Sequence, residues 1–491
     1  MQDQRFPEID PDARYDLLIN GQRTPGKDGA TFRCVDPYEN VEWGVVAEGG
    51  AVDVDLAVSA ARAAFEDWRF TPQRVRSAIL LRWARVIEDH VEELARTQTH
   101  ENGKTLAEMR GAAAAVGSFA SHIAHLALND HGESFESPLP GHQAWTLREP
   151  LGVIGAITPW NNPLSLLSWK LFPALATGNT IVVKPSEVTP VSTLRLIELG
   201  IEAGLPAGVA NVVTGAGSAG KALAEHPDVD KLAFTGSSAT GRAIALAGAE
   251  RFARVTLELG GKGPHIVFPD ADLDRAVDGL LTGLTAGHGQ ACNAGSRILV
   301  HADVHDEVIE KLGRKLAALR LGDPLDPQTQ MGPMASRPHL GRVLSYLDVS
   351  RDEGHRLVTG GQRPTAGGLA RGLFVEPTLY DAVPNASRLA QEEVFGPVGA
   401  AMTFTTEEEA VRLANDIPYG LTAGFWTKDV TRVHRLATRL RAGVLWINTW
   451  RVGSDQLPFG GMKASGIGRE TGLHALDAYT ETKSVWLGMT D

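Results

Sequence analysis

Cys292 is the residue in this sequence with the clearest chemical potential, and it is one of two cysteines in 491 residues. It lies in a segment of small, flexible residues, GHGQACNAGS, at 287–296. Glycines allow close backbone approach and positive φ, so N–H groups can point at one small site. A thiol with a pKa near ~8.5 needs local activation to act as a nucleophile. The segment is compatible with a catalytic thiol or with a buried structural cysteine, and Cys34, which has no such loop, is expected to be structural.

Two further side chains could take part in the same chemistry. Glu258 stands between leucines in LELGGK, at the end of a β-like run. Removal from water would raise its pKa and suit it to general-base duty, and a solvated strand-end glutamate is the alternative. Asn161, in TPWNNP, could donate a hydrogen bond to an oxyanion, although a plain turn asparagine is the commoner interpretation of this segment alone.

A third group of residues could hold phosphate or ribose oxygens. Lys184 and Glu187, in VKPSE, follow a strong β-like run, which is where a parallel sheet binds ligands. The segment FTGS at 234–237, followed by Gly241, resembles a strand–turn–helix anion site but lacks the strict Gly-x-Gly-x-x-Gly pattern. The 15 histidines show no metal-ligand spacing with the cysteines, so no metal site is expected.

The elements that must position these residues alternate along the middle of the chain. Strands alternating with helices predict crossover units and a parallel, doubly wound sheet. Several of the runs end in Gly, Pro or Ser, at the edge where such sheets place ligands. Short, often β-branched runs occur at 152–157, 180–184, 210–214, 231–235 and 256–259, with helical patterns at 191–203 and 220–226.

A second alternation begins near Ala271 and predicts a second α/β domain. It has helical patterns at 273–286 and 306–319 and β-like runs at 297–300, 399–404, 422–426 and 444–448. Before the first alternation, apolar residues recur at helical spacing over 52–68 and 74–99, which predicts amphipathic helices. The segments 128–150 and 473–491 fit neither alternation, and each is expected to be an arm that pairs elsewhere.

Composition excludes several classes of protein. Apolar residues make up 43% and charged residues 22%, which is typical of globular domains rather than of disordered or fibrous chains. A formal charge of -12 opposes a broad electrostatic grip on nucleic acid or on an anionic membrane surface. No apolar run approaches the ~20 residues of a membrane span, and the first 17 residues do not resemble a signal peptide. With two cysteines, a reducing, cytoplasmic location is expected.

Taken together and in order, these segments resemble the NAD(P)-dependent aldehyde dehydrogenase superfamily, from about Leu17 to Trp486. One such match would be weak, whereas eight in sequence order are specific. The matching segments are PWN at 159–161, KPSE at 184–187, FTGS at 234–237, ELGGK at 258–262, GQAC at 289–292, EEVFGPV at 392–398, Asn415 with YGL at 419–421, and PFGGMK at 458–463 with SG at 465–466 and GRE at 468–470.

The resemblance implies a role for each catalytic candidate. Cys292 would attack the aldehyde carbonyl, and Asn161 with the backbone N–H of Cys292 would stabilise the oxyanion. Hydride transfer would leave a thioester, and Glu258 would activate the water that hydrolyses it. Because relatives that pass the acyl group to coenzyme A generally lack this glutamate, water is the expected acceptor and a free acid the product.

The resemblance also implies a binding site for NAD. Lys184 and Glu187 would meet the adenosine ribose, Ser237 would lie near the pyrophosphate, and Glu393 would hold the nicotinamide ribose beside Phe395. Since the Glu187 carboxylate would repel a 2′-phosphate, NADP is possible but disfavoured. The full expected set is Ile157, Trp160, Lys184, Ser186, Glu187, Gly236, Ser237, Gly241, Leu259, Glu393 and Phe395.

The substrate is expected to be a polar or an aromatic aldehyde. The loop before Pro458 is polar and contains Arg451, which would face either the substrate or solvent. An aromatic aldehyde would stack on Trp450 or Trp169. The expected substrate-side residues are Asn162, Trp169, Ala291, Asn293, Trp450, Arg451 and Phe459.

The fold class implied is α/β, with a Rossmann-like parallel-sheet cofactor domain, a second α/β catalytic domain and a small β oligomerisation arm. The expected boundaries are 1–128 and 151–259 for the NAD-binding domain, 260–455 for the catalytic domain, and 129–150 and 471–491 for the arm and tail. A homodimer or homotetramer follows from the resemblance. Two alternatives are a catalytically idle relative with a binding or structural role and a semialdehyde dehydrogenase that uses NADP.

Overall fold

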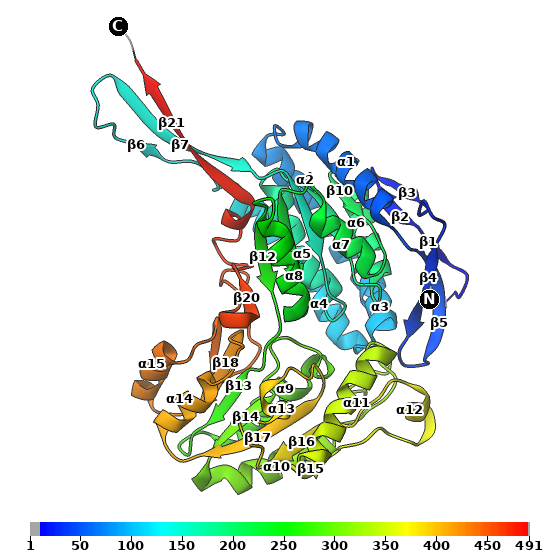
Figure 1. Cartoon of the computed structure of the whole chain (residues 1–491), viewed down its shortest axis with the longest axis vertical. Helices are drawn as coiled ribbons and strands as arrows, with labels where there is room; N and C mark the ends of the chain where they lie inside the picture. The colour runs from blue at the N-terminus through cyan, green and yellow to red at the C-terminus, as the bar shows by residue number, and fades with distance from the viewer. Residues whose placement is uncertain (1–9, 490–491) are drawn as a thin grey trace.

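The chain forms two large β-sheets, each covered by helices, and two small three-stranded sheets (Figure 1). This arrangement comes from a computed structural model, which describes residues 10–489. The two large sheets lie one above the other in Figure 1, and they confirm the expected α/β fold with parallel-sheet domains.

The first large sheet has eight strands. They are β2 (Leu17–Ile19), β3 (Gln22–Thr24), β8 (Val153–Ile157), β9 (Thr180–Lys184), β10 (Ala210–Val212), β11 (Lys231–Thr235), β12 (Arg254–Glu258) and β20 (Gly466–Ile467). Their order is β20-β12-β11-β8-β9-β10-β2-β3, with the five central strands parallel. The direction of winding reverses between β8 and β11, and ligands bind at the carboxyl ends of the strands at such a point.

Helices cover both faces of this sheet. One core lies under α1, α7 and α8, and another lies under α2, α4, α5 and α6. The strands β8, β9 and β11 are buried throughout, as expected of parallel strands with both faces covered. The helical pattern predicted over 74–99 is divided at His90 into two helices. The bounds are α1 (Ala51–Trp68), α2 (Gln73–Asp89), α3 (Val91–Asn102), α4 (Leu106–Ala127), α5 (Pro163–Ala176), α6 (Pro190–Glu202), α7 (Gly217–Glu225) and α8 (Ser238–Ala249).

The second large sheet has seven strands, all parallel except β15 at one edge. They are β13 (Pro264–Val267), β14 (Arg297–His301), β15 (Arg356–Thr359), β16 (Thr378–Asp381), β17 (Val398–Phe404), β18 (Thr422–Trp426) and β19 (Val444–Ile447). The second alternation was predicted to begin near Ala271, and that prediction is wrong because β13 precedes it. The helices are α9 (Leu273–Thr285), α10 (His305–Ala317), α11 (Arg337–Asp352), α12 (Gly367–Arg371), α13 (Arg388–Gln391), α14 (Glu407–Asn415) and α15 (Val430–Arg439).

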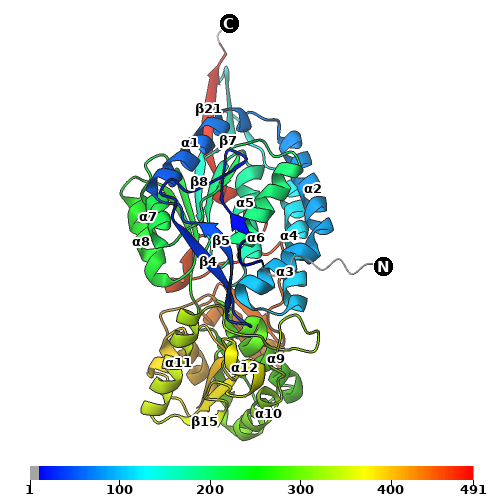
Figure 2. The ribbon, with the colours of Figure 1, turned by 90° about the vertical axis from the view of Figure 1, so that its right-hand side faces the viewer.

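A small sheet near the N-terminus links the two halves of the molecule. It consists of β1 (Arg14–Tyr15), β4 (Thr31–Asp36) and β5 (Val41–Ala47). Figure 2 shows β4 and β5 running from the first sheet down towards the second. The turn after β4 is anchored there, because the Leu373 N–H donates to the Pro37 carbonyl at 2.9 Å.

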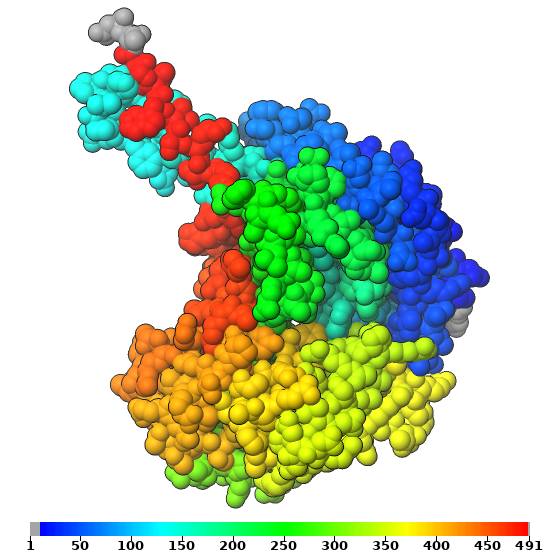
Figure 3. Space-filling model, in the orientation of Figure 1, coloured from blue at the N-terminus to red at the C-terminus, as the bar shows by residue number. Residues whose placement is uncertain are grey.

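The other small sheet forms an arm that projects from the body of the molecule (Figures 1 and 3). It contains β6 (Ser134–Phe135), β7 (His142–Pro150) and β21 (Thr480–Gly488), and β7 and β21 pair along their whole lengths. The two segments expected to pair elsewhere therefore pair with each other. Residues 471–479 were expected to belong to the arm and tail, but they do not extend into the arm. Ala475, Leu476 and Tyr479 pack into the core of the first sheet.

Candidate active site

The carboxyl ends of the first sheet meet the amino ends of the second. Glu258 ends β12, the loop with Cys292 precedes β14, and Glu393 lies shortly before β17. The Gly261 N–H donates to Glu393 Oε1 at 2.8 Å. A Cβ on Gly261 would lie 2.4 Å from the Cys292 carbonyl oxygen, so a glycine is required there. The linker between the sheets thus brings these predicted residues to one place.

Cys292 lies half-buried in a turn that follows a strained loop. Gly287, His288 and Gly289 all have positive φ, between 61° and 69°, which a histidine rarely adopts. Burial raises the pKa of the Cys292 thiol to about 12, and the charges of Glu393 and Glu258 act in the same direction. The Arg451 guanidinium opposes them. The thiol therefore requires a base or a positive charge nearby to become a thiolate.

Asn161 is held against the loop that carries the nucleophile. It follows β8 and is buried, and its Nδ2 donates to the Gln290 carbonyl at 3.0 Å. Pro163 at the first position of α5 fixes the start of that helix directly after it. An amide nitrogen carries two N–H groups, so one remains for an oxyanion formed next to Cys292.

Glu258 is a buried carboxyl without a hydrogen-bond partner. It is 3% exposed, and neither of its oxygens has a partner among the described residues. Burial, followed by the charge of Glu470, raises its pKa well above its ordinary value. Glu470 itself pairs with Lys170, with Nζ and Oε1 2.5 Å apart. Because its pKa is raised, the ionised form of Glu258 binds a proton more strongly than an ordinary glutamate does. This property suits a general base that takes a proton from water.

A cavity of about 470 Å³ opens at the ends of β8, β9 and β11. Its volume is in the range of small-molecule and cofactor sites, and it lies at the reversal point of the sheet. Six of the residues expected to bind the cofactor line it, namely Ile157, Trp160, Lys184, Ser186, Glu187 and Gly236.

The remaining residues expected at the cofactor lie behind or beside this cavity. The Ser237 hydroxyl caps α8 by accepting from the Thr240 N–H at 3.2 Å. Gly241 lies in van der Waals contact with Leu259, because a Cβ there would be 2.4 Å from Leu259 Cδ2. The Ser237 cap and the close contact at Gly241 together place the amino end of α8 at the cavity. The dipole of this helix favours an anion there.

Sequence reasoning missed one wall of the cavity. Gly217 and Gly220, at the beginning of α7, line it. They belong to GAGSAG at 215–220, which follows β10 and opens a helix. This is a Gly-x-Gly-x-x-Gly pattern in the context that favours dinucleotide binding, so a signal for this wall was present in the sequence.

Charged and aromatic residues complete the cavity side of the site. Lys184 Nζ lies 3.8 Å from Glu187 Oε2, and Glu187 is 54% exposed. Trp160 contacts Phe395 edge to face, with ring centroids 5.4 Å apart, and His339 at 4.7 Å. His339 also bonds the Phe395 carbonyl at 2.7 Å. Nothing in the sequence indicated His339, which lies on α11 and reaches the site only through the fold.

Some of the expected substrate-side residues are aromatic and partly exposed, and others are small or polar residues near Cys292. Trp169 packs on Phe459, with ring centroids 5.2 Å apart, and both rings are partly exposed. Ala291 and Asn293 flank Cys292, and Asn162 Oδ1 accepts from Lys104 Nζ at 3.1 Å. Trp450 differs from the expectation.

Trp450 is buried and stacks on His265, with ring centroids 3.9 Å apart. It also packs against Trp446, so it leaves too little free surface to stack on a substrate. Arg451, the next residue, does not turn fully to solvent, because its guanidinium lies close to Gly287. A Cβ added to that glycine would be 3.6 Å from Arg451 Nη1.

The described residues form neither a metal-binding cluster nor a membrane-spanning helix. Within residues 10–489, no cluster of three or more His, Cys, Asp or Glu side chains is placed to hold a metal ion. None of the helices in that part of the chain is both long and apolar enough to cross a bilayer.

The fold and the site define an oxidoreductase with a dinucleotide-type cavity beside a thiol. The model of the aldehyde dehydrogenase family matches residues 24–485. Betaine aldehyde dehydrogenase of Bacillus subtilis is 42% identical over 473 residues, 96% of each chain. Hydroxyisobutyraldehyde dehydrogenase of Mycolicibacterium austroafricanum is 42% identical over 475 residues, 96% of this chain and 94% of that protein.

Solved structures agree with this assignment. Betaine aldehyde dehydrogenase from Staphylococcus aureus, in complex with NAD+, superposes with a TM-score of 0.95 at 40% identity, over 97% of this chain and 95% of that one. The chain belongs to the aldehyde dehydrogenase family.

Proposed function

We propose that this protein oxidises an aldehyde to the carboxylic acid with NAD, through a thioester on Cys292. The observation that carries the proposal is the convergence of Cys292, Asn161 and Glu258 where the two sheets meet. Asn161 Nδ2 is bonded to the backbone two residues before the thiol, and the Glu258 charge acts on the thiol itself. These are the nucleophile, the oxyanion donor and the base that such a reaction requires.

The chemistry of the chain's own residues follows from this geometry. Cys292 Sγ, once deprotonated, forms a bond to the carbonyl carbon, and the oxygen becomes an oxyanion that Asn161 stabilises. The tetrahedral, oxyanionic carbon gives up hydride far more readily than the free aldehyde does. Loss of the hydride leaves the thioester. Glu258 then takes a proton from water, which attacks the thioester carbon and releases the acid and the thiol.

The cavity fits NAD in its chemistry as well as its size. A helix amino end at Ser237 suits the pyrophosphate, and Lys184 with Glu187 suits a ribose. When bound, NAD supplies the hydride acceptor. The exposed Glu187 carboxylate can accept from a free 2′-hydroxyl and repels a 2′-phosphate, which favours NAD over NADP. The NAD complex of the Staphylococcus aureus relative supports the same choice.

The experiment that tests the proposal follows NADH absorbance with NAD and a panel of aliphatic, aromatic, amino and carboxylate-bearing aldehydes. Cys292→Ala is expected to abolish oxidation. Cys34→Ala is the matched control, since Cys34 is buried in β4 away from the site and its loss should leave turnover within a few-fold. Unimpaired oxidation in Cys292→Ala would refute the proposal.

The substrate side supports an aldehyde with polar or aromatic character. Trp169 and Phe459 offer partly exposed rings, whereas Asn162, Asn293 and Arg451 offer polar groups. Betaine aldehyde and hydroxyisobutyraldehyde, for which two relatives are named, both carry polar groups. A strong preference for long unsubstituted alkanals would contradict this part of the proposal.

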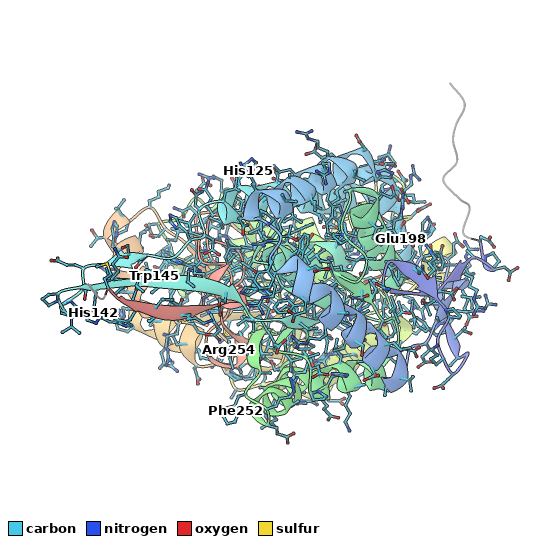
Figure 4. The ribbon with its side chains drawn as sticks, turned by 90° about the horizontal axis from the view of Figure 1, so that it is seen from above. His125, His142, Trp145, Glu198, Phe252 and Arg254 are labelled. Atoms are coloured by element: carbon cyan, nitrogen blue, oxygen red, sulfur yellow. The ribbon has the colours of Figure 1, made fainter. Side chains whose placement is uncertain are left out.

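The arm supports assembly into a homodimer or homotetramer. Trp486 is 57% exposed, and Leu147 and Leu487 are also exposed on this thin sheet. Figure 4 shows His142 and Trp145 on the arm, with Phe252 and Arg254 on the body. Exposed apolar groups on a projecting sheet mark an interaction surface.

Light scattering tests the assembly. Trp486→Asp is expected to lower the mass in solution, and Phe70→Asp, an exposed aromatic on the body, is the matched control. An unchanged mass in Trp486→Asp would contradict an interface on the arm.

A free catalytic thiol needs a reducing compartment, which supports the expected cytoplasmic location.

A further inference from the structure

Two cations, Lys104 and Arg451, lie around Gly287, in the loop that leads to Cys292. A Cβ built on Gly287 would lie 3.0 Å from Lys104 Nζ and 3.6 Å from Arg451 Nη1. The two positive groups are therefore within about 7 Å of each other, a separation at which like charges repel measurably. Burial lowers the pKa of Lys104 to about 8; the charge of Glu108 opposes this shift, and the charge of Arg451 adds to it.

The Glu108 carboxylate partly offsets the positive charge of this pair, because its charge acts on Lys104. Glu108 also has donors of its own: its Oε1 accepts from the Gly287 N–H at 2.7 Å, and its Oε2 accepts from the Thr105 hydroxyl at 3.3 Å. Lys104 has Asn162 Oδ1 as a neutral acceptor at 3.1 Å. The Arg451 guanidinium has no hydrogen bond or ion pair within residues 10–489.

The backbone at Arg451 is held in place by the packing of the preceding residue, Trp450. Trp450 is buried between His265 and Trp446, and His265 accepts from the Trp426 indole N–H at 2.7 Å. Arg451 itself has φ of 60°, a left-handed conformation that a non-glycine residue adopts only when the surroundings impose it. A half-buried guanidinium without an acceptor among the described residues can receive one from a ligand.

We propose that Arg451, with Lys104 behind it, selects aldehydes that carry a carboxylate group and disfavours those that carry a quaternary ammonium. The proposal rests on the proposed function and gives it a substrate class. A carboxylate can accept two parallel N–H bonds from the Arg451 guanidinium, while its aldehyde end reaches Cys292. A trimethylammonium group in the same place would meet two positive charges, of which the charge of Lys104 is offset by Glu108 and the charge of Arg451 is not paired among the described residues.

The test compares kcat/KM with NAD for matched aldehydes. The pairs are 4-oxobutanoate and 4-formylbenzoate, each with its neutral methyl ester, and betaine aldehyde provides a cationic probe. The wild-type protein is expected to prefer at least one acid over its ester by about tenfold or more. In Arg451→Gln that preference should disappear, a fall of about tenfold or more, while any loss shared by acid and ester reports the removal of a positive charge that acts on Cys292. Arg451→Asp should raise kcat/KM for betaine aldehyde relative to the acid.

Arg351→Gln is the matched control, because it removes an exposed arginine that pairs with Asp348 on α11, and it should leave all ratios unchanged. Equal kcat/KM for acids and esters in the wild type, or an equal loss for all probes in Arg451→Gln, would overturn the proposal. In either case oxidation of the esters would still uphold the proposed function. Failure of the wild type to oxidise any aldehyde would instead refute the proposed function itself.

Discussion

Replacing Glu258 by glutamine separates the two halves of the proposed reaction. The Glu258→Gln side chain keeps the shape of the buried carboxyl but cannot take a proton from water. Cys292 and Asn161 are untouched, so acylation and the first hydride transfer should proceed. A positioned general base contributes about 10²- to 10⁴-fold. At 1.36 kcal/mol for each factor of ten, the barrier to deacylation should rise by roughly 3–5 kcal/mol.

Rapid mixing with NAD and a good aldehyde substrate measures this effect. We expect a burst of about one NADH for each active site, followed by a steady rate that is lower than that of the wild type by the factor given above. Glu310→Gln, at an exposed glutamate on α10, is the matched control and should show wild-type turnover. If Glu258→Gln shows no burst and acid-quenched protein carries no acyl group on Cys292, Glu258 is not mainly the base for deacylation.

Three further predictions concern pH, stability and cofactor choice. Because Glu258 acts only when ionised and its pKa is raised, kcat should rise with pH along a limb well above pH 4.5, and a flat profile from pH 5 to 9 would contradict this. Lys170→Met leaves the buried Glu470 carboxylate unpaired and should lower the free energy of unfolding by about 3–5 kcal/mol in urea titration. The double variant Lys170→Met/Glu470→Leu should recover most of that loss, and no recovery would argue against the ion pair as the cause. Glu187→Ser should raise kcat/KM with NADP by about tenfold by removing a negative charge, and an unchanged NAD/NADP ratio would sink this explanation.

The strands predicted best are those whose burial shows in the sequence. The run at 180–184 became β9 and the run at 231–235 became β11, with identical bounds, because both are buried throughout. The strand at 264–267 was missed because it begins with a proline and contains His265, whose burial depends on Trp426 and Trp450 from distant parts of the chain. The break at His90 was missed because the apolar period continues through it without glycine or proline.

The candidate site could be predicted in its residue types but not in its contacts. The motifs around Cys292, Glu258 and Asn161 indicate the chemistry, and several cofactor residues line one cavity as expected. Lys104 was not predicted, since it lies in the turn between α3 and α4 and reaches the site only through tertiary packing. Its one local signal is Asn102-Gly103, which ends a helix with Gly103 at φ of 74°.

The last part of the chain serves several regions of the molecule in succession. From Arg451, beside Gly287, it pairs with the end of β12 through β20, places Glu470 near Glu258, and ends in the arm as β21. Arg254 on β12 also bonds Glu481 on β21 at 2.6 Å, which ties the base of the arm to the strand that carries Glu258. This stretch of the chain therefore connects the loop beside Cys292, the strand that carries Glu258 and the base of the arm.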